Sequence, residues 1–127
     1  MNRYNYTTYT LQEATAKMMK FCAYQERCHQ EVEKKLIEMR MIPEARQEIT
    51  YRLIQDNFLN EERFAKSFAR GKFTQKKWGK VRILRELKLR NISRFNIDSA
   101  LKEISTPSYL ETFEELFVKK WNTTKEP

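Results

Sequence analysis

The apolar residues of this 127-residue chain recur at three- and four-residue intervals, and their pattern repeats after 51 residues. Such spacing is typical of amphipathic α-helices, and a period near 50 residues indicates stacked copies of one small unit. The chain has only two glycines, which disfavours glycine-rich phosphate loops and tight-turned sheet folds. We therefore predict an all-α protein of tandem three-helix repeats, elongated, with about seven helices. The 51-residue shift aligns Ala14 with Ala65, Val32 with Ile83, Leu36 with Leu87, Met41 with Ile92, Ile49 with Ala100 and Leu53 with Ile104.

Capping residues and a proline divide the first repeat into three helices. Thr10 opens the capping-box sequence Thr-Leu-Gln-Glu, and the first helix runs from there to about Tyr24. A second helix starts near Cys28. Pro43 suits the first turn of a third helix, which ends near Asn57.

The second repeat is expected to follow the same order. Asn60 can cap a fourth helix, which weakens near Gly71, and a fifth helix runs from about Trp78 to a left-handed stop at Asn91. Ser93 can cap a sixth helix. The apolar side of the fifth helix is predicted to carry Val81, Leu84 and Leu87.

These signals divide the chain into four parts. Residues 1–9 form an N-terminal arm, residues 10–58 the first repeat and residues 59–105 the second. Residues 106–127 are predicted to be the first helix of an incomplete third repeat. Its apolar face must dock on the preceding repeat or stay exposed.

The net charge of +8 is concentrated in one block of the sequence. Residues 1–62 hold 9 Lys and Arg against 10 Asp and Glu, and residues 95–127 hold 4 against 6. Residues 63–94 hold 12 against the single acidic residue Glu86. Because self-repulsion destabilises so basic a segment, we expect an anionic partner, either nucleic acid or an acidic protein groove. The residues predicted to contact it are Arg63, Arg70, Lys76, Lys77, Lys80, Arg82, Arg85 and Lys88.

Two residues of this block have a second interpretation. Arg63 follows an acid-rich helix start, where an arginine often pairs with a glutamate or caps a carbonyl, so it can instead fix one repeat on the next. Trp78, with Lys80 as its expected neighbour, can anchor the turn before the fifth helix or stack on a base.

The residues that commonly carry catalysis or bind metals are sparse. His29 is the only histidine, and Cys22 and Cys28 lack the paired spacing of zinc sites. No nucleophile–base arrangement can be drawn, and the carboxylates gather at helix starts, where the helix dipole explains them. We predict no enzyme, no cofactor and no metal. Without a signal peptide, a disulfide framework or an apolar run of about 18 residues, a reducing, cytoplasmic location without membrane contact is expected.

Two segments of the second repeat are distinctive, Leu59-Asn60-Glu61-Glu62-Arg63-Phe64-Ala65 and Trp78-Gly79-Lys80-Val81-Arg82-Ile83-Leu84-Arg85-Glu86-Leu87. Through these segments above all, residues 11–104 resemble the RecX family of recombination regulators, which are built from tandem three-helix repeats. Cys28 stands where a capping serine is common in the family, Asn91 where glycine is common and Val32 where leucine is common, and the third repeat is incomplete.

The resemblance implies modulation, usually inhibition, of the RecA recombinase. RecX proteins bind along the groove of the RecA filament and impair ATP hydrolysis and strand exchange, and some also bind DNA. We therefore expect a monomeric, non-enzymatic regulator of recombination and DNA repair, with the RecA filament and, weakly through phosphates, DNA as its partners. The alternative is a free-standing DNA-binding module with the fifth or sixth helix as recognition helix. A third interpretation, an adaptor for another acidic protein, is compatible with the charge alone.

Overall fold

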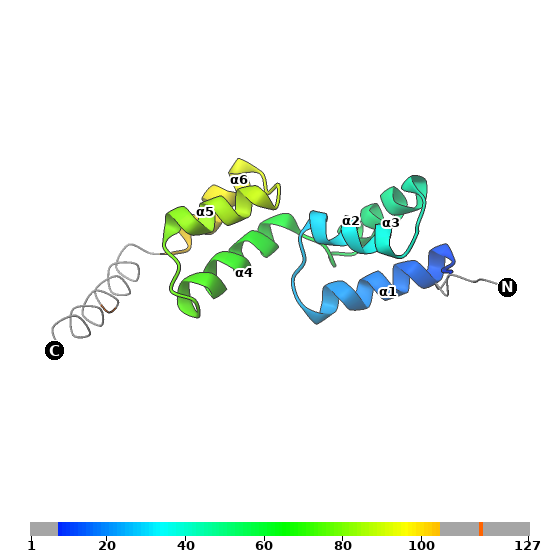
Figure 1. The fold of residues 1–127 in the computed structure, drawn as a ribbon, viewed down its shortest axis with the longest axis horizontal. Helices are drawn as coiled ribbons and strands as arrows, with labels where there is room; N and C mark the ends of the chain where they lie inside the picture. The colour runs from blue at the N-terminus through cyan, green and yellow to red at the C-terminus, as the bar shows by residue number, and fades with distance from the viewer. Residues whose placement is uncertain (1–7, 105–114, 116–127) are drawn as a thin grey trace, which may run out of the picture. The chain divides into compact units, whose positions relative to one another are not determined.

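The computed structural model describes residues 8–104 and Glu115. These residues hold six α-helices and no strand, which confirms the all-α class (Figure 1). Residues 1–7 of the predicted N-terminal arm lie outside the described residues. The predicted helix from Thr106 lies outside them as well, apart from Glu115. The helices are α1 (Leu11–Tyr24), α2 (His29–Glu38), α3 (Pro43–Gln55), α4 (Glu61–Thr74), α5 (Lys80–Leu89) and α6 (Arg94–Lys102).

The chain divides into two compact units, and the boundary follows Phe64 in the first turn of α4. In the first unit, α1 and α2 both pack against α3 (Figure 1). Their facing side chains form one apolar core, which supplies most of the unit's stability. The buried members of this core are Ala14, Met18, Cys22, Val32, Leu36, Met39, Met41, Ile49, Leu53 and Leu59.

The second unit contains the rest of α4 together with α5 and α6. The helices α5 and α6 pack against each other (Figure 1). Each of the three helices buries one stripe of apolar side chains, as expected of amphipathic helices around a shared core. The buried residues of this unit are Ala65, Ala69, Phe73, Ile83, Leu87, Ile92, Ile97, Ala100 and Ile104.

The tandem three-helix repeat is confirmed by the helix boundaries. The helices α5 and α6 begin 51 residues after α2 and α3, and α4 begins 50 residues after α1. Both partners are buried in all six aligned pairs of apolar residues. The turns agree too, because Arg40 and Asn91, which are 51 residues apart, both have left-handed backbones with φ of 61° and 59°.

The predicted helix caps are also present. The Thr10 side chain accepts a hydrogen bond from the Glu13 backbone at 3.1 Å, and the Glu13 carboxylate accepts one from the Thr10 backbone at 2.9 Å. This capping box lowers the pKa of Glu13. Asn60 accepts a hydrogen bond from the Arg63 backbone at 2.8 Å, and the Ser93 side chain caps α6.

Three predictions about the second repeat are wrong in detail. Val81 does not face the core; it is 68% exposed, and Ile83 takes the buried position. The helix α5 begins at Lys80, not at Trp78. The helix α4 does not weaken at Gly71 but continues to Thr74, because burying Phe73 outweighs the roughly 1 kcal/mol that a glycine costs inside a helix.

Candidate partner-binding surface

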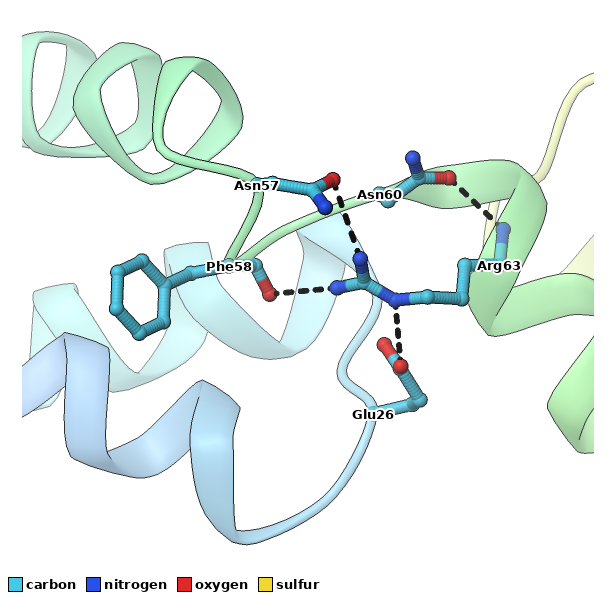
Figure 2. A network of polar contacts seen from close by, with 5 residues as sticks. All are labelled: Glu26, Asn57, Phe58, Asn60 and Arg63. Atoms are coloured by element: carbon cyan, nitrogen blue, oxygen red, sulfur yellow. Dashed lines mark hydrogen bonds and ion pairs between the residues drawn. The ribbon is translucent and has the colours of Figure 1, made fainter.

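Arg63 is held by contacts within the first unit. Its guanidinium donates from Nε to Glu26 Oε2 at 2.5 Å, from Nη1 to Asn57 Oδ1 at 3.1 Å and from Nη2 to the Phe58 carbonyl at 3.2 Å (Figure 2). Glu26 lies between α1 and α2, whereas Asn57 and Phe58 lie between α3 and α4. One side chain therefore ties two chain connections to the first turn of α4. These contacts agree with the structural interpretation of Arg63, and we leave it out of the partner-binding surface.

Arg70 and Lys66 share one acidic partner at the end of α6. Arg70 Nη1 lies 3.0 Å from Glu103 Oε2, and Lys66 Nζ lies 3.6 Å from Glu103 Oε1. One carboxylate cannot neutralise both cations, and the Arg70 side chain remains 62% exposed. Arg70 thus keeps access to solvent but already has a partner within the chain.

Lys76 and Lys77 lie in the connection between α4 and α5, and both are exposed. Lys77 has a left-handed backbone with φ of 58°, and its Nζ lies 3.8 Å from Glu115 Oε2. Among the described residues, Lys76 makes no ion pair. This connection therefore presents two cations, one of which faces a distant and exposed carboxylate.

Trp78 anchors the connection between α4 and α5. Its ring meets the Phe68 ring edge-on, with 6.2 Å between the centroids. Lys72 Nζ lies 5.0 Å from the Trp78 centroid, and Arg82 Cζ lies 4.0 Å from it. Both distances are within the range of cation–π attraction. Lys80, which the sequence suggested as the neighbour of this ring, is half-buried at the start of α5.

The same contact occurs in the first repeat with the two partners exchanged. Arg27 Cζ lies 3.8 Å from the Phe21 ring centroid, and Arg27 Nε donates to the Phe21 carbonyl at 3.0 Å. A shift of 51 residues carries Phe21 to Lys72 and Arg27 to Trp78, whose backbone N–H donates to the Lys72 carbonyl at 3.0 Å. A cation–aromatic pair therefore closes the first helix of both repeats. We did not predict a role for Lys72, although the 51-residue shift points to it.

The helix α5 presents a face of mixed chemistry to solvent. Ile83 and Leu87 are buried, and the opposite side of the helix is exposed. We call this side the α5 outer face. In the described part of the chain, the side chains of Arg85 and Lys88 make no ion pair or hydrogen bond. The α5 outer face consists of Val81, Arg82, Arg85, Lys88 and Leu89.

Neither the cysteines nor the acidic residues form a reactive or metal-binding centre where the chain is described. Cys22 and Cys28 are buried free thiols. Burial raises the pKa of Cys22 to about 11, and it also raises the pKa of Cys28, so both thiols are protonated at neutral pH. Residues 8–104 and Glu115 contain no cluster of three metal-ligating side chains. None of the six helices is long and apolar enough to cross a membrane.

Comparison with known proteins relates the chain to one group. Residues 60–101 match the family model of RecX, second three-helix domain. The chain is similar in structure to the crystal structure of regulatory protein RecX, with a TM-score of 0.81 and 23% identity over 92% of this chain and 59% of that one. RecX from Lactobacillus salivarius gives the same TM-score and identity, over 90% of this chain and 74% of that one. No curated protein matches this sequence. The chain thus spans about three-fifths of the first of these structures, and the structural likeness establishes the fold.

Proposed function

We propose that this chain, whose residues 60–101 match the second three-helix domain of RecX, acts as a RecX-type regulatory protein. In this role it binds the RecA–DNA filament and inhibits its ATP hydrolysis and strand exchange without catalysing a reaction itself. One observation carries the proposal. The repeat that matches the RecX domain model is also the repeat that holds the excess charge, with 13 Lys and Arg against 5 Asp and Glu over residues 59–104. Residues 10–58 hold 8 of each.

The proposed contact is electrostatic in its first step. A filament of recombinase on DNA presents phosphates and acidic side chains, and a concentrated positive surface speeds encounter with such a partner and orients it. Lys76, Arg85 and Lys88, whose side chains make no ion pair within residues 8–104 and Glu115, are best placed for this role, with Lys77, Lys80 and Arg82 beside them in the chain. Once bound, the repeats obstruct the motions of the filament that accompany ATP hydrolysis.

The test is charge reversal on the α5 outer face. The double substitution Arg85→Glu/Lys88→Glu leaves the Trp78 contacts in place and is expected to relieve the inhibition of DNA-dependent ATP hydrolysis by RecA, with unchanged helical circular dichroism. The matched control is Lys20→Glu/Lys34→Glu, which makes the same charge change at exposed positions of the first repeat. Inhibition that survives the first pair, or is lost equally with the control pair, would overturn the proposal.

The unpaired cations also support the second candidate, a free-standing DNA-binding module. Such a module makes several phosphate contacts, so its affinity for DNA without RecA falls by orders of magnitude over a few-fold rise in salt. A salt titration with duplex and single-stranded DNA separates the two functions. Tight, steeply salt-dependent binding to DNA combined with no effect on RecA would favour the module.

A further inference from the structure

We infer that the α5 outer face, together with Phe95, binds an acidic protein surface that has an apolar centre, and that it does not bind the phosphates of DNA. This inference rests on the proposed function. It names the component of the RecA–DNA filament that this face of the second repeat contacts, which is the protein.

Val81, Arg85 and Leu89 follow one another at four-residue steps, so they form a single row along α5, opposite the buried Ile83 and Leu87. Val81 and Leu89 are 68% and 64% exposed. The Arg85 guanidinium, which has no partner in the part of the chain that the structure describes, therefore lies between two exposed aliphatic side chains.

An exposed aromatic side chain lies close by in the sequence. Phe95 is in the first turn of α6, which packs against α5, and it is 74% exposed. Only the short turn from Arg90 to Ser93 separates α5 from α6. A single exposed apolar residue is ordinary on a protein surface, but an aliphatic row interleaved with unpaired cations is the composition of a binding surface.

The first repeat is an internal control for the exposed residues of the second. The two repeats share helix starts, core positions and the left-handed turn after their second helix, so their exposed positions face the same structural demands. At the positions of Val81, Leu89 and Phe95 the first repeat has other residues, all polar and all exposed. They are Gln30, Glu38 and Glu44. The fold therefore does not require apolar residues there.

The difference between the repeats is not one of hydrophobicity alone. The first repeat exposes Ile37 and Ile42 where the second has Lys88 and Ser93. The corresponding face of α2 carries one apolar residue and one cation, Ile37 and Lys34, beside the acidic Glu31 and Glu38. The α5 outer face instead carries two apolar residues, three cations and no acidic residue.

A phosphodiester backbone satisfies arginine and lysine but gains nothing from valine, leucine or phenylalanine. A protein surface with an apolar centre buries those side chains, and acidic residues at its edge pair with the cations around them. Arginine and aromatic residues are also the side chains most often found to dominate such interfaces.

The test changes the apolar residues and leaves the charge alone. The triple substitution Val81→Gln/Leu89→Gln/Phe95→Gln removes no cation, so phosphate binding is preserved, whereas docking on a protein loses its apolar contacts. With the fluorescently labelled chain, anisotropy is expected to show at least tenfold weaker binding to RecA filaments on single-stranded DNA. Binding to the same DNA without RecA is expected to be unchanged. The melting temperature should not fall, because all three side chains are exposed.

The control variant Ile37→Gln/Ile42→Gln/Tyr51→Gln changes three exposed apolar residues of the first repeat and is expected to bind the filament like the wild type. If the Val81, Leu89 and Phe95 variant also binds the filament like the wild type, or loses affinity for DNA alone to the same extent, the inference is refuted and the proposed function stands. If the wild type itself fails to bind or inhibit the filament, the proposed function is refuted and the inference falls with it.

Discussion

Replacing Arg63 by alanine is expected to destabilise the first unit substantially without directly affecting the partner-binding surface. The substitution removes three side-chain hydrogen bonds, to Glu26, Asn57 and the Phe58 carbonyl. The two bonds to neutral acceptors contribute about 1 kcal/mol each. The Arg63 and Glu26 side chains are 37% and 29% exposed, so solvent screening limits their ion pair to about 1 kcal/mol. We therefore expect the free energy of unfolding to fall by about 2–3 kcal/mol.

The assay is urea unfolding followed by circular dichroism at 222 nm. The control is Arg52→Ala, which breaks an exposed ion pair with Asp56 at the C-terminal end of α3 and should cost no more than about 0.5 kcal/mol. Arg63→Lys keeps the charge but loses the planar fork that reaches two connections, so its cost should lie between the two. If Arg63→Ala costs no more than Arg52→Ala, the network does not stabilise the fold and our reasoning about Arg63 is refuted.

Three further predictions concern single residues. Arg40→Gly is expected to raise the free energy of unfolding by about 0.5–1 kcal/mol in urea titrations, because Arg40 has a left-handed backbone with φ of 61°, and a decrease would contradict this. Trp78→Ala should lower the free energy of unfolding by about 1–2 kcal/mol, since Lys72 and Arg82 lose their aromatic partner. Trp78→Phe should recover part of this loss. A Trp78→Ala variant as stable as the wild type would count against the anchoring role. Burial raises the pKa of Cys22 from 9.0 to about 11, so the folded state holds the thiol proton more tightly than the unfolded state. The contribution of this thiol to stability is complete below pH 9 and is lost as the pH rises toward 11. Urea midpoints at pH 8 and pH 10.5 should therefore differ more for the wild type than for Cys22→Ala.

The helices were predictable because their signals are local. Thr10, Asn60 and Ser93 cap the helices that the sequence assigned to them, and Asn91 makes the left-handed turn. A capping side chain binds a backbone group only two or three residues away, so short stretches of sequence contain the whole interaction.

The inner face of α5 shows where periodicity fails. Five of the ten residues of α5 are apolar, and they are spread over more than half of the helix circumference. Helical spacing alone therefore selected Val81 as a core residue instead of Ile83. The alignment of Ile83 with Val32 did identify the buried position, because residues at equivalent positions of the two repeats occupy the same place in the fold. The repeat was a better guide to the core than the helical period.

The basic composition of the candidate surface was predictable, but its ion pairs were not. The sequence located the basic block, yet Arg63 meets Glu26 from 37 residues away, and Arg70 meets Glu103 from 33 residues away. Such pairs depend on how helices pack, and charge counts along a chain do not contain that information. Only the structure therefore separates the cations that have partners from those, such as Arg85, that have none among the described residues.

The exchanged cation–aromatic pairs limit how this architecture can be re-engineered. A consensus sequence averaged over both repeats treats positions 21 and 72 as equivalent, and likewise positions 27 and 78. It can combine Phe21 with a tryptophan, or Lys72 with an arginine, and so place two rings or two like charges where each natural repeat has one of each. When these repeats are grafted or shuffled, positions 21 and 27, or 72 and 78, should therefore be taken together from the same repeat.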